Sequence, residues 1–266
     1  MKKLIFFDID GTIITDGPGE HIIPGSFPET LSALQKNGHL CFINTGRAFS
    51  EVDDVIRRLP FDGYICGCGT YIEYKGKTLY SYTIPFETGN EILRSLNDCH
   101  LSWLLEGTRH VYYSSLPYQT RIQEFKDEHS QMIPEAFRII TPEQERDIEF
   151  DKFCICLDKN HQFDKFYEQY KGILTFIDRK GGFYEIVPKG HSKASGIAFL
   201  ENYFGVPRED TISIGDSAND LPMLEYTGFS IAMGNSSSEV FDIADYVTDS
   251  VMEDGIYHAM KHLGLI

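Results

Sequence analysis

The chain has 266 residues, with 24 Lys and Arg against 40 Asp and Glu, so its formal net charge at pH 7 is −16. A hydrophobic content of 42% argues against disorder, and the length suggests one or two domains with a sizeable core. Nucleic acids and anionic membranes attract basic proteins, so this charge disfavours both as partners. A small anionic substrate fits only where local positive charge or a metal ion offsets the carboxylates.

The N-terminal segment, the lack of a long apolar run and the cysteines lead us to expect a protein of the cytoplasm. No apolar run approaches the roughly 18 residues of a membrane span, and the apolar start of the chain meets Asp8 too early for a secretory signal. Six cysteines are too few for a disulfide scaffold. The pairs Cys66/Cys68 and Cys154/Cys156 lack the usual spacing of a zinc site, and we expect them to be core residues in a reducing compartment.

The first part of the chain alternates strand-like and helix-like patterns. Continuous apolar runs predict buried strands at 4–7, 40–43 and 64–66. Between them, a capping-box spacing at 26–29 opens a helix that ends at Gly38, and Val52, Val55, Ile56 and Leu59 have helical spacing. This alternation is the signature of a parallel, doubly wound sheet.

The same alternation returns at the C-terminal end. It predicts strands at 211–214, 229–232 and 246–248, and helices around 198–200, 221–224 and 256–263. The middle is richer in aromatic residues, with its own strands at 103–105, 110–113, 153–157 and 173–177, and Pro85 and Gly181-Gly182 are read as hinges. We therefore expect an α/β protein with a Rossmann-like core of residues 1–82 and 185–266, and an inserted α+β domain of residues 83–184.

Two clusters of carboxylates follow predicted strands. Asp8 and Asp10 come directly after the first strand and, two residues apart on an extended chain, face one site. Asp216 and Asp220 follow the strand at 211–214, with Asn219 between them. Open α/β sheets bind ligands at this end of their strands, and clustered carboxylates favour Mg²⁺. An acidic turn or a helix cap would explain one such residue, but not both clusters.

Two further segments carry groups suited to phosphate. Thr45 offers a hydroxyl and Gly46 a backbone N–H after the strand at 40–43, although an N-cap threonine explains Thr45 equally well. Lys193, taken alone, reads as a solvated surface residue.

Together these four segments resemble the haloacid dehalogenase superfamily, and more narrowly its Cof-type phosphatases with a large α/β cap. The resemblance implies a Mg²⁺-dependent phosphatase in which Asp8 is the nucleophile that forms an aspartyl-phosphate and Asp10 is the acid and base. It implies that Asp8, the Asp10 backbone carbonyl and Asp216 hold Mg²⁺, with Asp220 in support. Thr45, Gly46, Lys193 and Asn219 would hold the phosphoryl oxygens, and the substrate would be a small phosphorylated metabolite such as a sugar phosphate.

Two positions depart from this group's pattern, and other functions stay open. Cys68-Gly69-Thr70 stands where the group commonly has Asn-Gly-Ala, and Ala194 follows Lys193 where glycine is frequent. A phosphomutase shares the same aspartyl-phosphate, and a binding protein without turnover is a third reading. The second aspartate of Asp8-Ile9-Asp10 argues against a dehalogenase, which has no need for a proton donor there. The sequence does not indicate the oligomeric state.

Overall fold

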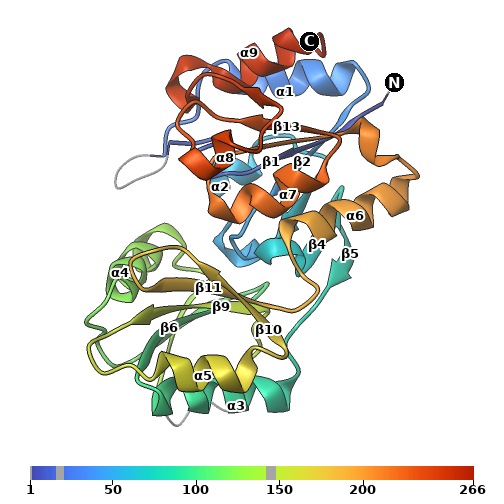
Figure 1. The fold of residues 1–266 in the computed structure, drawn as a ribbon. Helices are drawn as coiled ribbons and strands as arrows, with labels where there is room; N and C mark the ends of the chain where they lie inside the picture. Colours follow the sequence, from blue (N-terminus) through green and yellow to red (C-terminus); the bar gives the residue numbers. More distant parts are fainter. Residues whose placement is uncertain (1, 16–20, 142–147) are drawn as a thin grey trace. The chain divides into compact units, whose positions relative to one another are not determined.

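The computed structural model describes residues 2–15, 21–141 and 148–266, which form two compact units (Figure 1). The core unit comprises residues 1–46, 55–80 and 192–266, and the inserted unit comprises residues 47–54 and 81–191. In the described ranges, no helix combines the length and the apolar character needed to cross a membrane.

The core unit is built on an eight-stranded sheet in the order β14-β13-β12-β1-β2-β3-β4-β5. The strands from β14 to β3 pair in parallel, and β4 pairs antiparallel with β3. This confirms the predicted doubly wound α/β architecture. The strands are β1 (Leu4–Phe7), β2 (Leu40–Asn44), β3 (Gly63–Cys66), β4 (Tyr71–Tyr74), β5 (Lys77–Ser81), β12 (Thr211–Gly215), β13 (Phe229–Ala232) and β14 (Tyr246–Val247).

The strand order changes direction at β1. From β1 the chain proceeds to β2 and β3 on one side, whereas β12 and β13 lie on the other side. Doubly wound sheets bind their ligands at the carboxyl ends of the strands beside such a switch point. Asp8 follows β1 and Asp216 follows β12, so both aspartates lie at this place in the topology.

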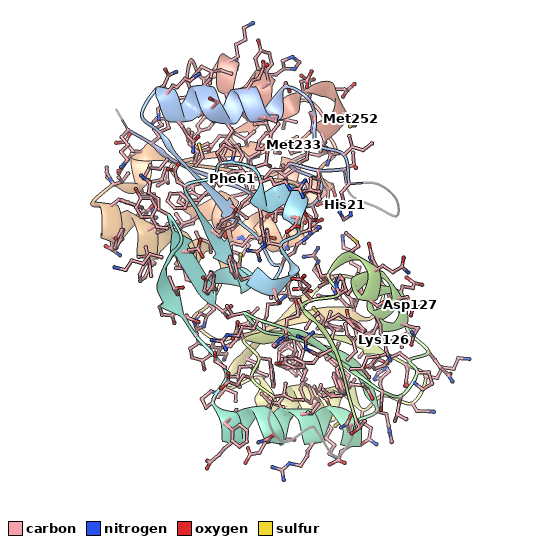
Figure 2. The ribbon with its side chains drawn as sticks, turned by 180° about the vertical axis from the view of Figure 1, so that it is seen from behind. His21, Phe61, Lys126, Asp127, Met233 and Met252 are labelled. Carbon is pink, nitrogen blue, oxygen red and sulfur yellow. The ribbon has the colours of Figure 1, made fainter. Side chains whose placement is uncertain are left out.

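Helices cover both faces of the core sheet (Figure 1). Phe6 and Phe42 face the side with α6 and α7, whereas Phe7 points to the other side and packs edge-on against Phe27 of α1. Phe61 contacts both Phe7 and Phe27, at ring-centroid distances of 5.9 and 6.0 Å (Figure 2). The helices are α1 (Phe27–Lys36), α2 (Asp54–Arg57), α6 (Lys193–Phe204), α7 (Leu221–Tyr226), α8 (Ser238–Phe241) and α9 (Gly255–His262).

The inserted unit has a six-stranded sheet in the order β10-β11-β9-β6-β7-β8, mostly antiparallel. One face, with Trp103 and Phe153, packs on α3 and α5. The other, with Leu104 and Cys154, packs against α4, on which Lys126 donates to the Ser114 carbonyl (Figure 2). The elements are α3 (Phe86–Asp98), β6 (Leu101–Glu106), β7 (Val111–Ser114), α4 (Ile122–Met132), β8 (Phe137–Ile140), β9 (Lys152–Leu157), α5 (Phe163–Tyr170), β10 (Leu174–Asp178) and β11 (Phe183–Pro188).

The structure differs from the sequence expectations at two places. The helical spacing at 52–59 produces only the single turn α2, preceded by a 3-10 turn at Phe49–Glu51. Gly181 and Gly182, which we interpreted as a hinge, form the turn between the paired strands β10 and β11, with φ of +64° and +76°. Glycine tolerates positive φ, so the same residues serve a tight turn as readily as a hinge.

Candidate active site

Four charged side chains from three parts of the core unit converge at the carboxyl end of β1. Asp8 follows β1 directly, and its backbone N–H donates to the Ile214 carbonyl of β12 at 3.1 Å. Asp220 ends a short 3-10 helix (Ala218–Asp220) just after β12, and Lys193 is the first residue of α6. A lysine, on its own expected at the surface, is therefore placed inside the molecule beside two aspartates.

Lys193 is ion paired with both neighbouring aspartates. Its Nζ lies 2.7 Å from Asp8 Oδ1 and 2.5 Å from Asp220 Oδ1. The side chains of Lys193 and Asp220 are fully buried, and that of Asp8 is 5% exposed. A charge removed from water is stable only when it is paired and hydrogen-bonded, so this geometry fixes the three groups tightly.

Asp216 completes a cluster of carboxylates. One ligand atom from each of Asp8, Asp216 and Asp220 lies within 4.8 Å of the others. Asp220 is oriented by its other oxygen, Oδ2, which accepts hydrogen bonds from the backbone N–H groups of Asp216 and Ser217, both at 3.0 Å. Asp216 Oδ1 accepts from the Thr12 hydroxyl at 3.3 Å.

Burial and mutual repulsion shift the ionisation of this cluster. Burial, followed by the Asp220 charge, raises the pKa of Asp8 to about 7, even though Lys193 acts to lower it. For Lys193, burial alone would lower the pKa, but Asp220 and Asp8 together outweigh it and raise the pKa above its usual value. We conclude that Lys193 stays protonated among three clustered carboxyl groups.

This arrangement fits a small divalent cation. Three carboxylates within reach of one ion are the oxygen ligands that Mg²⁺ prefers, and a bound cation would relieve the repulsion that raises the pKa of Asp8. The chain also leaves room at this point, because Gly11 has φ of +71° and a Cβ there would lie 2.4 Å from Asp216 Oδ2. Asp8, Asp216 and Asp220 are therefore the side chains that could hold the metal.

The other expected site residues lie along the same edge of the core sheet. β1 and β2 run in register, with Phe7 opposite Ile43, so the buried Thr45 and Gly46 follow β2 close to the level of Asp8. Asn219 stands beside Asp220 and accepts a hydrogen bond from the Ser217 hydroxyl at 2.8 Å.

Asp10 is near enough to Asp8 for its charge to raise the Asp8 pKa. Its side chain is not part of the three-carboxylate group.

Two asparagines that we assigned no role also support the site. Asn235 Nδ2 donates to the Gly11 carbonyl at 2.7 Å, and its Oδ1 accepts from the Val251 N–H at 3.1 Å. Asn44 Nδ2 donates to the Lys193 carbonyl at 3.1 Å. A buried or bridging amide of this kind has no sequence pattern of its own, because its partners are distant in the chain.

The unusual Cys68 lies in a short turn, Gly67–Gly69, that packs against α6, the helix that begins at Lys193. Its side chain is 1% exposed, its φ is +52°, and its backbone N–H donates to the Thr45 carbonyl at 3.2 Å. A negative charge on Cys68 would raise the pKa of Lys193 further, after the larger effects of Asp220 and Asp8. A thiol therefore lies next to Thr45, one of the expected phosphate-binding residues, at a position where the group that the sequence resembles commonly has an amide.

Comparisons with known proteins identify the family of the chain. The family model described as haloacid dehalogenase-like hydrolase matches residues 5–260. The chain is 30% identical over 268 residues to the Bacillus subtilis (strain 168) protein named "Putative phosphatase YkrA". The match covers 100% of this chain and 99% of that protein. The chain is also 23% identical over 262 residues to the "5-amino-6-(5-phospho-D-ribitylamino)uracil phosphatase YcsE" of the same organism, over 98% of this chain and 95% of that protein.

Solved structures show the same fold over the whole chain. The phosphatase BT1666 from Bacteroides thetaiotaomicron superimposes with a TM-score of 0.84 at 27% identity, covering 100% of this chain and 96% of that one. The subclass IIB sugar phosphatase BT4131 gives a TM-score of 0.83 at 27% identity, with complete coverage of both chains. With its fold, its buried aspartate cluster and a family match over almost its entire length, the chain belongs to the haloacid dehalogenase-like hydrolase family, as an enzyme with the fold of that superfamily's phosphatases.

Proposed function

We propose that this enzyme is a Mg²⁺-dependent phosphohydrolase that removes phosphate from small phosphorylated metabolites through an aspartyl-phosphate at Asp8. The observation that carries the proposal is the pairing of Asp8 with a fully buried Lys193 at 2.7 Å, beside Asp216 and Asp220 at the switch point of the sheet. An anionic nucleophile approaches an anionic phosphate only where positive charge shields both. Lys193 supplies one such charge from the protein itself.

Two residues carry the bond changes. An Asp8 carboxylate oxygen attacks phosphorus, and the bond to the leaving oxygen breaks as that oxygen takes a proton from the Asp10 carboxyl group. A water molecule then attacks the same phosphorus, Asp10 takes up its proton, and the bond to Asp8 breaks. The cycle releases an alcohol and inorganic phosphate and restores both carboxyl groups to their starting states.

The remaining site residues hold the phosphoryl group. The Thr45 hydroxyl, the Gly46 N–H, the Asn219 amide and the Lys193 ammonium are the donors available for its three outer oxygens. Mg²⁺, held by Asp8, Asp216, Asp220 and the Asp10 backbone carbonyl, would neutralise charge on the phosphoryl group when bound.

We assign the two units different tasks. The core unit carries every residue of the proposed chemistry, and we propose that the inserted unit is the cap that selects the substrate. Sugar phosphates are the substrate class we favour, because BT4131 is named a sugar phosphatase and shares the fold over its full length. We place the reaction in the cytoplasm, in keeping with six buried cysteines that are all free thiols.

The test is phosphate release from a panel of phosphorylated sugars, nucleotides and p-nitrophenyl phosphate, with and without Mg²⁺. We expect Mg²⁺-dependent release with at least one sugar phosphate, and its loss in Asp8→Asn, a variant that keeps the shape of the side chain but removes the nucleophile. Transfer of phosphate between hydroxyls of one sugar, without release, would identify a mutase instead. Binding without turnover of any substrate would identify a binding protein.

A further inference from the structure

Asn44 is a buried amide at the centre of the core unit that the proposed chemistry does not use. It ends β2, immediately before Thr45, and its side chain is completely buried. Its Nδ2 donates to the backbone carbonyl of Lys193 at 3.1 Å and approaches Met223 Sδ at 3.5 Å. Its Oδ1 has no hydrogen-bond partner within the described ranges.

The Lys193 carbonyl oxygen, which can only accept a hydrogen bond, determines which end of the Asn44 amide faces it. With oxygen and nitrogen exchanged, the side-chain oxygen would face the Lys193 carbonyl oxygen, and two acceptors would meet without a proton between them. Nδ2 therefore points to Lys193. An amide in this position costs stability, since a buried, unpartnered carbonyl loses its hydrogen bonds to water and gains none in return.

The bond connects two structural elements that carry site residues. Lys193 begins α6, and its ammonium reaches Asp8 at the end of β1. Phe7 of β1 pairs with Ile43 of the parallel strand β2. The residues that follow them, Asp8 and Asn44, therefore lie level with each other. One hydrogen bond thus holds the start of α6 to the edge of the sheet that bears the nucleophile.

We propose that Asn44 is a positioning residue, which holds the backbone of Lys193 so that its ammonium stays aligned with Asp8 and the phosphoryl group. This inference rests on the proposed phosphatase function. It explains why a group that lowers stability occupies a fully buried position: the amide N–H sets the placement of a charge that acts on the reaction. The role needs the N–H and not merely the volume of the side chain.

The test is Asn44→Leu, which keeps the volume approximately and removes the N–H. We expect kcat to fall about tenfold, the effect of one misplaced hydrogen-bonded group, while KM and the Mg²⁺ concentration for half-maximal activity change less than about twofold. The thermal unfolding midpoint should stay the same or rise, because the unpartnered carbonyl is removed as well. A purely structural asparagine predicts the reverse, with a lower midpoint and an unchanged kcat.

A matched control lies between α1 and the same strand. Asn37, the residue that follows α1, donates its Nδ2 to the Leu265 carbonyl at 2.7 Å. Asn37→Leu should leave kcat unchanged and lower the unfolding midpoint. Should Asn44→Leu not fold, Asn44→Ala adds no atoms and carries the same expectation for kcat and KM.

The outcomes separate this inference from the proposed function. If the wild-type enzyme releases phosphate and the folded Asn44 variant has the same kcat, Asn44 is not a positioning residue. The proposed phosphatase function is unaffected by that result. A wild-type protein that releases no phosphate from any substrate refutes the proposed function and this inference with it.

Discussion

Lys193 Nζ lies 2.7 Å from Asp8 Oδ1, and both side chains are almost completely removed from water. The ammonium comes from the first residue of a helix, whereas the carboxylate follows a strand nearly two hundred residues earlier in the chain. The folded sheet brings them together at its switch point, and this pairing gives the site a cation fixed beside the proposed nucleophile.

Removal of this cation should damage both activity and stability. In Lys193→Met, Asp8 and Asp220 lose their partner, and we expect kcat to fall by at least about 100-fold, as for other groups that stabilise transition-state charge. The free energy of unfolding without metal should fall by about 3–5 kcal/mol, the usual cost of breaking a buried ion pair. Phosphate release and urea unfolding measure the two effects.

Lys171→Met is the control for this substitution. Lys171 pairs with Glu168 at 2.5 Å, but both side chains are largely exposed, at 48% and 64%. Exposed pairs contribute little, so activity and stability should both stay near the wild-type values. A Lys193→Met enzyme with wild-type kcat would contradict the role of the buried pair.

A substitution at Gly11 tests the space beside the proposed metal ligands. Gly11→Ala would place a Cβ 2.4 Å from Asp216 Oδ2, in a backbone conformation with φ of +71°. We expect Asp216 to be displaced, with weaker Mg²⁺ binding and at least about a tenfold loss of kcat. Isothermal titration with Mg²⁺ and a rate assay measure these changes.

Gly76→Ala separates backbone strain from crowding. Gly76 has nearly the same φ, +76°, but no atom lies within 4 Å of a Cβ there. It should lose about 1 kcal/mol of stability and keep the wild-type affinity for Mg²⁺. Equal Mg²⁺ affinities in the two variants would show that the space beside Asp216 does not matter.

Metal removal should abolish activity reversibly. Three clustered carboxyl groups share the single Lys193 ammonium, so without a metal ion the site should bind a phosphate ester poorly. We expect EDTA to stop phosphate release and added Mg²⁺ to restore it. Full activity in the presence of excess chelator would argue against the three-carboxylate metal site.

A buried carboxyl group in the inserted unit should make stability depend on pH. Burial raises the pKa of Asp151 from 3.8 to about 6, although hydrogen bonds from Thr108 and Thr83 act to lower it. The folded protein therefore holds a proton that the unfolded chain releases, and the contribution of Asp151 to stability is lost as the pH rises from about 4 to about 6. The total loss is on the order of 3 kcal/mol.

Asp151→Asn removes this dependence, because an amide does not titrate. The difference in unfolding free energy between Asp151→Asn and the wild type should shift in favour of the variant between pH 4 and pH 6, and stay constant above about pH 7. Urea titrations across this range measure it. Parallel stability curves for the two proteins would show that Asp151 ionises normally.

The sequence carried enough information for the core sheet and for the carboxylates at its edge. β1, β2 and β12 are continuous apolar runs, and polar residues directly after them must lie at the carboxyl ends of the strands. The strands β4 and β5 at the edge of the core sheet are partly exposed, and no pattern distinguished them from a loop. The same holds for β8 in the inserted unit, where exposed and buried residues mix.

The supporting contacts could not be predicted, since they depend on tertiary packing. Asn44 and Lys193 are 149 residues apart, and Asn235 and Gly11 are 224 residues apart. Lys193 reads as a surface residue until the aspartates around it are known. The resemblance to a known family implied a phosphate-binding role for Lys193, and the structure shows that the side chain is buried between Asp8 and Asp220.

The most direct test of the account is to trap the phosphorylated enzyme. Enzyme mixed with a substrate of the panel in Mg²⁺ and quenched with acid within milliseconds should contain a peptide spanning Asp8 that carries one phosphoryl group. With p-nitrophenyl phosphate, whose leaving group needs no proton from Asp10, the variant Asp10→Asn should accumulate more of this peptide, because the base for the second step is missing. Asp8→Asn should contain none. Rapid phosphate release with no phosphorylated peptide in any of these enzymes would contradict nucleophilic attack by Asp8.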